Sequence, residues 1–291
     1  MSSPKPTILV QLDTDAQPSV FDAVVAADAG VDHLLRHASV TPENVRDLVY
    51  GALFTRGHDD LHRTAIFVGG SDVAAAETVL EAVKAAFFAN FRVSVLFDAN
   101  GANTTAAAAV LAALEGSGGS LTGVRAAVLA ATGPVGQRVA RLLSRCGAVV
   151  AVGSRSLDRA ASVADTLRRV TGGEFTPFAT ASPDELSRGL SGSEVVIAAG
   201  AAGATLLPLQ VRKALHGLQV VIDLNAVPPL GIEGVGSTDR GVLNDGPRGW
   251  GAVGVGVSKM KIHKRAIQDL FTSSDKFLDA EEVLAIGRTL A

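Results

Sequence analysis

The stretch AVLAATGPVGQRVARLL, residues 127–143, decides the fold class. An apolar strand runs into closely spaced glycines and then into an amphipathic helix, which is the plan of a dinucleotide-binding βαβ unit. Gly133 and Gly136 occupy the second and third glycine positions of the G-x-G-x-x-G pattern, and Ala131 stands at the first. A methyl group is tolerated there only if Ala131 keeps a negative φ. We expect a Rossmann-type nucleotide site; the alternative is an ordinary glycine turn of an α/β protein.

The residues that follow this turn favour NADP over NAD. Backbone N–H groups at the start of the helix would face the pyrophosphate. Roughly 20 residues on, where an NAD site usually carries Asp or Glu, the sequence instead reads Ser154, Arg155 and Ser156. A guanidinium and two hydroxyls suit a 2′-phosphate, although Arg155 and Arg159 could also be solvated helix residues. The expected cofactor-binding residues are Thr132, Gly133, Pro134, Val135, Gly136, Ser154, Arg155, Ser156, Arg159, Ala199, Gly200 and Asn225.

The wider pattern indicates two α/β domains. The chain has 291 residues, of which 47% are hydrophobic and 19% charged, so it can bury a large core. Short apolar runs alternate with helical patterns, which predicts βαβ units and parallel sheets. The Gly- and Ser-rich segment 115–123 is the expected linker. We expect a Rossmann NADP-binding domain at residues 122–258, and an α/β substrate domain formed by residues 1–121 with 259–291.

Individual elements follow from the same patterns. Thr41 before Pro42 predicts an N-cap, and capping boxes begin at Ser182 and Asp279. The expected strands are 7–12, 64–69, 92–97, 124–130, 148–153, 194–200 and 219–224, and the expected helices of the first half are 18–29, 42–54, 72–88 and 105–115.

Composition excludes several classes of function. A net charge of −3 gives no basis for binding nucleic acid or an acidic membrane. The chain shows neither a signal peptide nor an apolar run of membrane-spanning length, so we expect a cytoplasmic protein. No Cys/His cluster has metal-ligand spacing, and the single Cys146 fits a buried structural thiol. Hydride transfer, in which a cofactor carries the difficult chemistry, fits this inventory.

Polar clusters follow three expected strands of the first half, at residues 13–15, 70–72 and 98–105. Because ligands bind outside the carboxyl ends of parallel strands, these clusters should lie along one edge of a sheet. Taken singly, each fits a helix cap, as Asp72 does. Their recurrence at three strand ends predicts a ligand with several hydrogen-bonding groups, such as a pterin.

For two later segments the sequence allows both a functional and a structural role. Residues 222–236 carry Pro228-Pro229 and closely spaced glycines, and could cover a nicotinamide or form a structural crossing. Lys259 and His263 lie one helical turn apart and could share a face toward a cleft, or belong to a solvated basic face.

The whole chain resembles the methylene-tetrahydromethanopterin dehydrogenases of one-carbon-metabolising bacteria. Within that family it is most similar to the NADP-dependent branch, some members of which also use methylene-tetrahydrofolate. The resemblance rests on six segments in the same order: LDTDAQPSVFDAVVAADAG, TAIFVGGSD, NGANTTAAA, ATGPVGQRVA, DLNAVPPLGIEGVG and GAVGVGVSKMKIH.

This resemblance implies a reaction and a set of roles. A methylene bridge between two pterin nitrogens would be oxidised to a methenyl bridge, with hydride passing to NADP⁺. Lys259 would orient the substrate, Asp22 would supply negative charge, and Phe21 would lie against the pterin. The implied substrate-binding residues are Asp15, Phe21, Asp98, Asn100, Asn103, Thr104 and Thr105. The family also implies a homo-oligomer, a trimer or larger.

Two alternatives stay open at this point. A shikimate-dehydrogenase-type NADP oxidoreductase would share the order of a substrate domain, a linker and a Rossmann unit. In a non-catalytic NADP or pterin sensor, Lys259 would point away from the cleft, with no room for a nicotinamide beside it.

Overall fold

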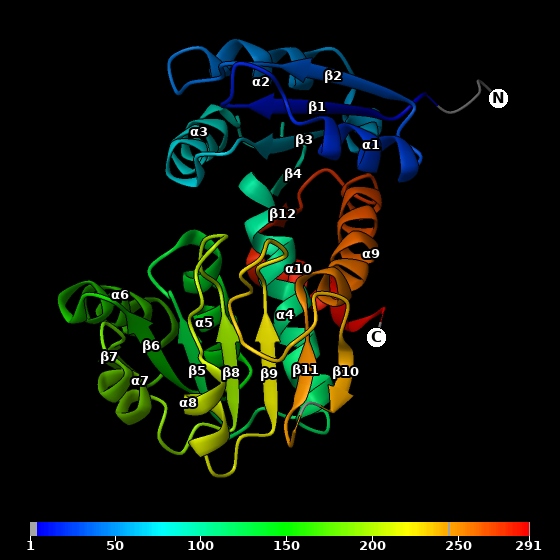
Figure 1. The fold of residues 1–291 in the computed structure, drawn as a ribbon. Helices are drawn as coiled ribbons and strands as arrows, with labels where there is room; N and C mark the ends of the chain where they lie inside the picture. The colour runs from blue at the N-terminus through cyan, green and yellow to red at the C-terminus, as the bar shows by residue number, and fades with distance from the viewer. Residues whose placement is uncertain (1–4, 244, 291) are drawn as a thin grey trace. The chain divides into compact units, whose positions relative to one another are not determined.

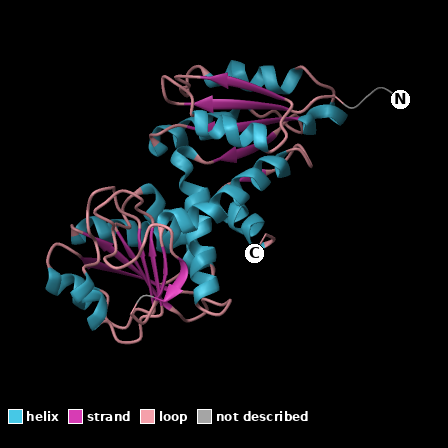
Figure 2. Cartoon of the chain, turned by 45° about the vertical axis from the view of Figure 1, so that its right-hand side comes forward, coloured by secondary structure: helices cyan, strands magenta, loops and turns pink. Residues whose placement is uncertain are grey.

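The computed structural model describes residues 5–243 and 245–290. Its contacts divide the chain into two compact units. Unit one comprises the chain up to Thr104 together with Met260–Leu290, and unit two comprises Thr105–Lys259. Each unit is built on one sheet with helices packed on its faces (Figures 1 and 2). The two long helices α4 (Ala102–Gly116) and α9 (Ala252–Leu270) carry the chain across the unit limits.

Unit one has a parallel five-stranded sheet in the order β12-β4-β3-β1-β2. The central strands are buried almost throughout, as apolar runs covered on both faces should be. The strands are β1 (Ile8–Asp13), β2 (His33–His37), β3 (Thr64–Gly69), β4 (Ser94–Phe97) and β12 (Phe277–Leu278). The helices are α1 (Val20–Asp28), α2 (Val45–Phe54), η1 (His58–Arg63), α3 (Val73–Ala86), η2 (Ala99–Gly101) and α10 (Ala280–Arg288).

Unit two has a seven-stranded sheet in the order β10-β11-β9-β8-β5-β6-β7, and among its described residues only the β10–β11 pair is antiparallel. The series β7-β6-β5-β8-β9 follows the Rossmann strand order. The strands are β5 (Arg125–Leu129), β6 (Val149–Ser154), β7 (Phe175–Ala179), β8 (Val195–Ala198), β9 (Val220–Asp223), β10 (Arg240–Leu243) and β11 (Arg248–Trp250). The helices are α5 (Pro134–Arg145), α6 (Leu157–Thr171), α7 (Pro183–Gly189) and α8 (Leu209–Ala214).

The predicted fold class, an α/β protein with parallel sheets and a Rossmann-type unit, is confirmed. Two details were wrong. Thr41 does not cap α2, because residues 42–44 first form a turn, in which the side-chain oxygen of Asn44 accepts from the backbone N–H of Thr41 at 2.9 Å. Cys146 is partly exposed rather than buried, because α5 ends there and the thiol lies at its C-cap.

The predicted capping residues elsewhere are confirmed. Asp72 accepts hydrogen bonds from two backbone N–H groups of α3, and Ser182 with Glu185 forms a complete capping box at α7. At α10 the backbone N–H of Asp279 donates to the carboxylate of Glu282 at 3.1 Å. Across the described ranges, none of the helices combines the length and the apolar character that a bilayer crossing requires.

Candidate active site

In the glycine turn of unit two, Ala131 keeps the negative φ that its methyl group requires. Ala131 is fully buried, and the residue in the left-handed conformation is Ala130, with φ of 54°. The backbone N–H of Ala131 donates to the carbonyl of Gly153 at 2.9 Å, which ties the turn to β6. A Cβ on Gly136 would lie only 2.7 Å from the Cα of Ala131, so the close packing of α5 on the turn requires glycine there.

Gly133 has no such packing requirement. It forms the N-cap of α5 with an ordinary φ of −79°, and the nearest atom to an added Cβ is the Ala130 carbonyl at 3.6 Å. The space above this glycine is therefore open. A small residue with open space at a helix N-terminus fits the close approach of a pyrophosphate to the backbone.

A pocket of about 360 Å³ opens beside this turn. Two guanidinium groups, those of Arg155 and Arg159, line it, and none of its described lining residues is acidic. Hydroxyl groups come from β6 and the start of α6: Ser154 accepts from the Ser156 N–H at 3.4 Å, and Ser156 caps α6. The lining residues are Ala130, Thr132, Ser154, Arg155, Ser156, Arg159, Thr180 and Leu206.

Three of these lining residues, Ala130, Thr180 and Leu206, were not predicted, and Ala130 belongs to the glycine turn itself. Thr180 follows β7, and its N–H donates to the Ser154 carbonyl at 2.9 Å. Leu206 lies beyond the end of β8, beside Gly200, where an added Cβ would lie 2.6 Å from the Leu206 Cδ1. The sequence signal for β7 is weak because a proline lies within that strand, so Thr180 could not be placed beside Arg155 in advance. Leu206 lies in a loop without periodic pattern, so its position was not predictable either.

Asn225 shapes the loop after β9. It is buried, and its side-chain amide donates to the carbonyls of Val227 at 2.9 Å and Pro229 at 3.0 Å. The neighbouring carboxylate of Asp223, which was not predicted, accepts from the N–H groups of Asn225 and Ile232, both at 3.0 Å. Burial raises the pKa of Asp223, and these backbone hydrogen bonds oppose that rise.

In unit one, the polar clusters after β1, β3 and β4 lie together at one edge of the sheet. The carboxylate of Asp15, after β1, accepts from the N–H of Ser71 at 3.0 Å and from its hydroxyl at 2.8 Å. The N–H of Asn100, after β4, donates to the Gly70 carbonyl at 2.7 Å. The three strand ends are thus joined by hydrogen bonds.

Within the third cluster, some predicted residues are buried and others are exposed. The carboxylate of Asp98 accepts from the N–H groups of Asn103 at 2.9 Å and Thr104 at 3.0 Å, so it caps the start of α4. The Asn103 amide donates to the Phe97 carbonyl at 2.6 Å, and the Thr104 hydroxyl donates to Asp98 at 2.6 Å. Asn100, by contrast, is exposed, with a left-handed φ of 52°.

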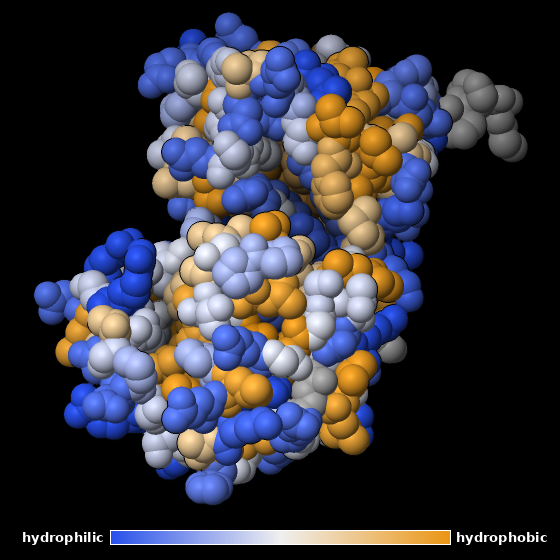
Figure 3. Space-filling view, in the orientation of Figure 1, coloured by the Kyte–Doolittle hydropathy of each residue, from blue (hydrophilic) through white to orange (hydrophobic). Residues whose placement is uncertain are grey.

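The start of α1 brings an aromatic ring and a carboxylate together. Phe21 is 50% exposed, and its α1 neighbours Val20 and Val24 are exposed as well. The space-filling view shows a hydrophobic patch over α1 (Figure 3). The neighbouring side chain of Asp22 is largely buried, and its Oδ1 lies 4.0 Å from Nε2 of His263. The predicted Lys259 is partly buried and belongs to the unit-two part of α9.

His263 was not among the predicted site residues. It is fully buried on α9, with its ring stacked at 5.8 Å on Phe67 and 6.3 Å from the ring of Phe21. A histidine between two aromatic rings and beside a carboxylate is held in one orientation. The sequence shows that His263 lies one helical turn from Lys259, but it does not show that His263 pairs with Asp22, near the other end of the chain.

Solved dehydrogenase structures share this fold. Shikimate 5-dehydrogenase from Listeria monocytogenes superposes with a TM-score of 0.56 at 16% identity, over 98% of this chain and 96% of that one. Quinate dehydrogenase from Corynebacterium glutamicum gives a TM-score of 0.53 at 15% identity, over 98% of each chain. At these identities the likeness defines the fold alone, a Rossmann-type α/β architecture found in NAD-binding dehydrogenases.

Sequence relatives define the family. The protein-family model described as "Methylene-tetrahydromethanopterin dehydrogenase, N-terminal" matches residues 20–100 of this chain. Bifunctional protein MdtA of Methylorubrum extorquens is 45% identical over 284 residues, 98% of this chain and 99% of the relative. The NAD(P)-dependent methylenetetrahydromethanopterin dehydrogenase of the same organism is 30% identical, over 96% of this chain and 94% of the relative. The chain belongs to the methylene-tetrahydromethanopterin dehydrogenase family of oxidoreductases, which confirms the predicted resemblance.

Proposed function

We propose that this enzyme oxidises the methylene bridge of methylene-tetrahydromethanopterin to a methenyl bridge in one-carbon metabolism, with NADP⁺ as the acceptor. The observation that carries the proposal is the 45% identity to MdtA along 98% of the chain. That similarity favours a pterin dehydrogenase over a shikimate-type oxidoreductase, whose likeness is limited to the fold. The word "bifunctional" in the name of this relative also fits methylene-tetrahydrofolate as a second substrate.

The pocket beside the glycine turn supports NADP as the cofactor. When bound, NADP⁺ supplies the hydride acceptor. Arg155 and Arg159 would donate to the 2′-phosphate, with hydroxyls from Ser154 and Ser156. The described lining residues include no carboxylate, which matches a dianionic ligand. Thr132 and the turn would hold the pyrophosphate. The turn consists of Gly133, Pro134, Val135 and Gly136. In this proposal Ala199 and Gly200 border the cofactor site, and Asn225 shapes the neighbouring loop.

The chemistry requires little acid–base work from the protein. The oxidised pterin is an amidinium-like cation shared between two nitrogens, so no proton has to leave in the hydride step. The side chains therefore position the substrate and balance its charge. We assign Lys259 to orienting a carboxylate, a carbonyl or a pterin edge, and Asp22 to compensating positive charge, with His263 fixing the orientation of the Asp22 carboxylate.

The pterin would lie at the polar edge of unit one. Phe21 is exposed and apolar, as a ring that stacks on a heterocycle should be. Asn100 and Thr105 are the less buried members of the third cluster, and we assign them to substrate contacts. Asp15 accepts from Ser71 in the loop after β3. The side chains of Asp98, Asn103 and Thr104 hydrogen-bond within the third cluster and to the end of β4, and so would shape the site.

We further propose that residues 1–121 with 259–291 act as the pterin-binding part and residues 122–258 as the NADP-binding part. A cytoplasmic homo-oligomer, a trimer or larger, completes the proposal. Sedimentation of the purified chain tests the oligomer, and a monomer at assay concentrations would contradict it.

The test of the function is direct. Purified protein is mixed with NADP⁺ and either methylene-tetrahydromethanopterin or methylene-tetrahydrofolate, and the absorbance of NADPH and of the methenyl-pterin is followed. We expect both products to form in equal amounts with the methanopterin substrate. If neither methylene-tetrahydromethanopterin nor methylene-tetrahydrofolate is turned over, the proposed reaction is refuted.

A further inference from the structure

A second cavity, of about 570 Å³, lies in unit one and has no part in the proposed reaction. Its walls come from the segments that precede β3, β4 and β12, so it lies at the amino ends of these strands. The proposed pterin-binding residues follow the carboxyl ends of β1, β3 and β4, at the opposite edge of the same sheet. A volume in the range of roughly 300–1,000 Å³ is typical of pockets that bind small molecules.

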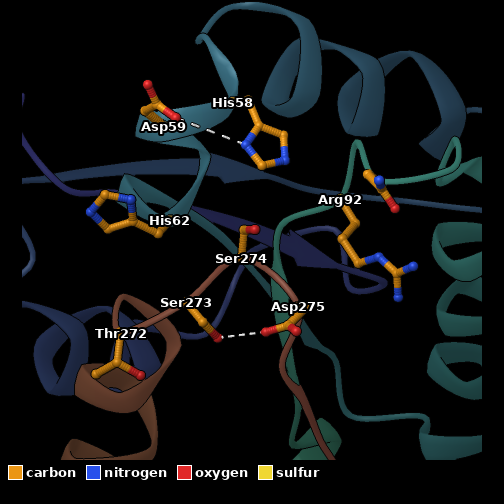
Figure 4. A pocket seen from close by; sticks show the side chains of 9 residues that line it. His58, Asp59, His62, Arg92, Thr272, Ser273, Ser274 and Asp275 are labelled. Atoms are coloured by element: carbon orange, nitrogen blue, oxygen red, sulfur yellow. Dashed lines mark hydrogen bonds and ion pairs between the residues drawn. The ribbon is translucent and has the colours of Figure 1, made fainter.

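Several hydrogen-bond donors line the cavity. Two imidazoles, those of His58 and His62, come from η1, the guanidinium of Arg92 from the segment before β4, and the hydroxyl of Ser274 from the loop before β12 (Figure 4). Arg92 donates to the Ala89 carbonyl at 3.3 Å and forms no ion pair with the residues that the structure describes. Its remaining N–H groups are available to an anion such as a phosphate.

Two carboxylates among the lining residues argue against a simple anion site. Asp275 accepts the hydroxyl of Ser273 at 2.7 Å, and the fully exposed Asp59 lies 4.0 Å from Nδ1 of His58. Free phosphate would be repelled by both. A ligand that carries hydroxyls as well as a phosphate would use them, since carboxylates pair with ribose hydroxyls in nucleotide sites.

An aromatic strip begins where the cavity ends. Phe91 lies between the lining residues Asn90 and Arg92, and its ring meets His58 edge-on at 6.5 Å. From Phe91 the strip continues to Phe54 at 6.2 Å and to Tyr50 at a further 5.4 Å. Phe54 is 59% exposed, so a planar ring can reach this surface. Any of the nucleobases can stack on such side chains, because each base has an aromatic face.

We propose that this cavity binds a nucleoside monophosphate. The phosphate lies at Arg92 and Ser274, the sugar hydroxyls pair with Asp275, and the base packs against His58 and Phe91. The Arg92 guanidinium and the N–H groups of His58 and His62 can donate to the oxygens of a single phosphate. A triphosphate would place excess negative charge beside Asp59 and Asp275.

Calorimetric titration of the full chain with AMP and with GMP, in the presence of saturating NADP⁺, tests the proposal. NADP⁺ occupies the dinucleotide pocket, so the titration reports the second cavity. We expect one nucleotide per chain, with adenosine and inorganic phosphate each binding at least about tenfold more weakly. Arg92→Gln should weaken AMP or GMP about tenfold or more, because it removes a charge-assisted hydrogen bond.

Arg169→Gln is the matched control, since Arg169 is an exposed arginine of α6 that lines neither pocket. It should leave nucleotide binding unchanged. Absence of binding of both nucleotides, equal affinity for inorganic phosphate, or binding that survives Arg92→Gln would each overturn the proposal. Thermal unfolding of both variants shows whether a loss of binding reflects a loss of folding.

Discussion

Replacement of Arg155 by alanine isolates the interaction that we propose selects the cofactor. Arg155 lines the pocket beside the glycine turn and is exposed, so its removal leaves no buried cavity. A hydrogen bond to a charged group contributes about 1.5–3 kcal/mol, and about 1.4 kcal/mol corresponds to a factor of ten. Because Arg155 is exposed to screening water and Arg159 remains in the pocket, we take the lower limit. The expected loss in kcat/KM for NADP⁺ is about tenfold.

The assay compares the two cofactors at one fixed concentration of the methylene-pterin. NAD⁺ lacks the 2′-phosphate, so its kcat/KM should change little, and the ratio of the two values should fall about tenfold. Higher salt should reduce the difference between wild type and variant, since it screens the same charge.

Arg169→Ala serves as the control for the loss of one positive charge on α6. The Arg169 guanidinium donates to the Thr166 hydroxyl at 3.1 Å and does not line the pocket. Its replacement should leave both cofactor values unchanged. An equal loss for NADP⁺ and NAD⁺ in Arg155→Ala, or no loss for either, would refute the role assigned to Arg155.

Three further changes probe other parts of the site. Gly136→Ala should lower affinity for NADP⁺ and reduce stability by about 1–3 kcal/mol, because its Cβ would lie 2.7 Å from the Ala131 Cα; unchanged binding and unfolding would contradict the packing argument. In Asp223→Asn one of the two carboxylate oxygens becomes an NH₂ group, so one of the two backbone N–H groups that they accept loses its acceptor. This change should lower the free energy of unfolding by about 1–3 kcal/mol. The raised pKa of Asp223 means that the wild type loses stability as pH rises through it, so the difference in denaturant midpoint between wild type and Asp223→Asn should narrow with rising pH; a difference that widens would show the opposite sign. Lys259→Ala should raise KM for the methylene-pterin about tenfold, as loss of a charge-assisted contact does; unchanged kcat and KM would remove Lys259 from the site.

Strands whose residues are buried on both faces were predictable from sequence, because they are continuous apolar runs. β1, β3, β5 and β8 are such strands. β2 was missed because its HLLRH sequence is largely exposed and lacks an apolar run, and the two residues of β12 carry no local signal at all. These strands are recognised only through the neighbours with which they pair.

The residues that line the pocket beside the glycine turn were more predictable than the contacts within unit one, for a physical reason. The turn, the serines and the arginines of this pocket lie close together in sequence, since a βαβ unit brings the ends of successive strands to one place. Thr180 and Leu206 reach the same pocket from weakly patterned segments. The pairing of Asp22 with His263 joins α1 to α9 and depends on tertiary packing alone.

A polar residue at a strand end has two possible uses that the sequence cannot separate. Asp and Asn are both good helix caps and good ligand-binding groups, so the cluster after β4 fits either purpose. Burial makes the distinction, because a buried carboxylate such as Asp98 must satisfy its acceptors within the protein. Asp98 does so through the N–H groups of α4, whereas Asn100 is exposed and held in a left-handed turn. We therefore propose that exposed groups such as Asn100 and Phe21 contact the pterin directly, and that the buried members keep those groups in place.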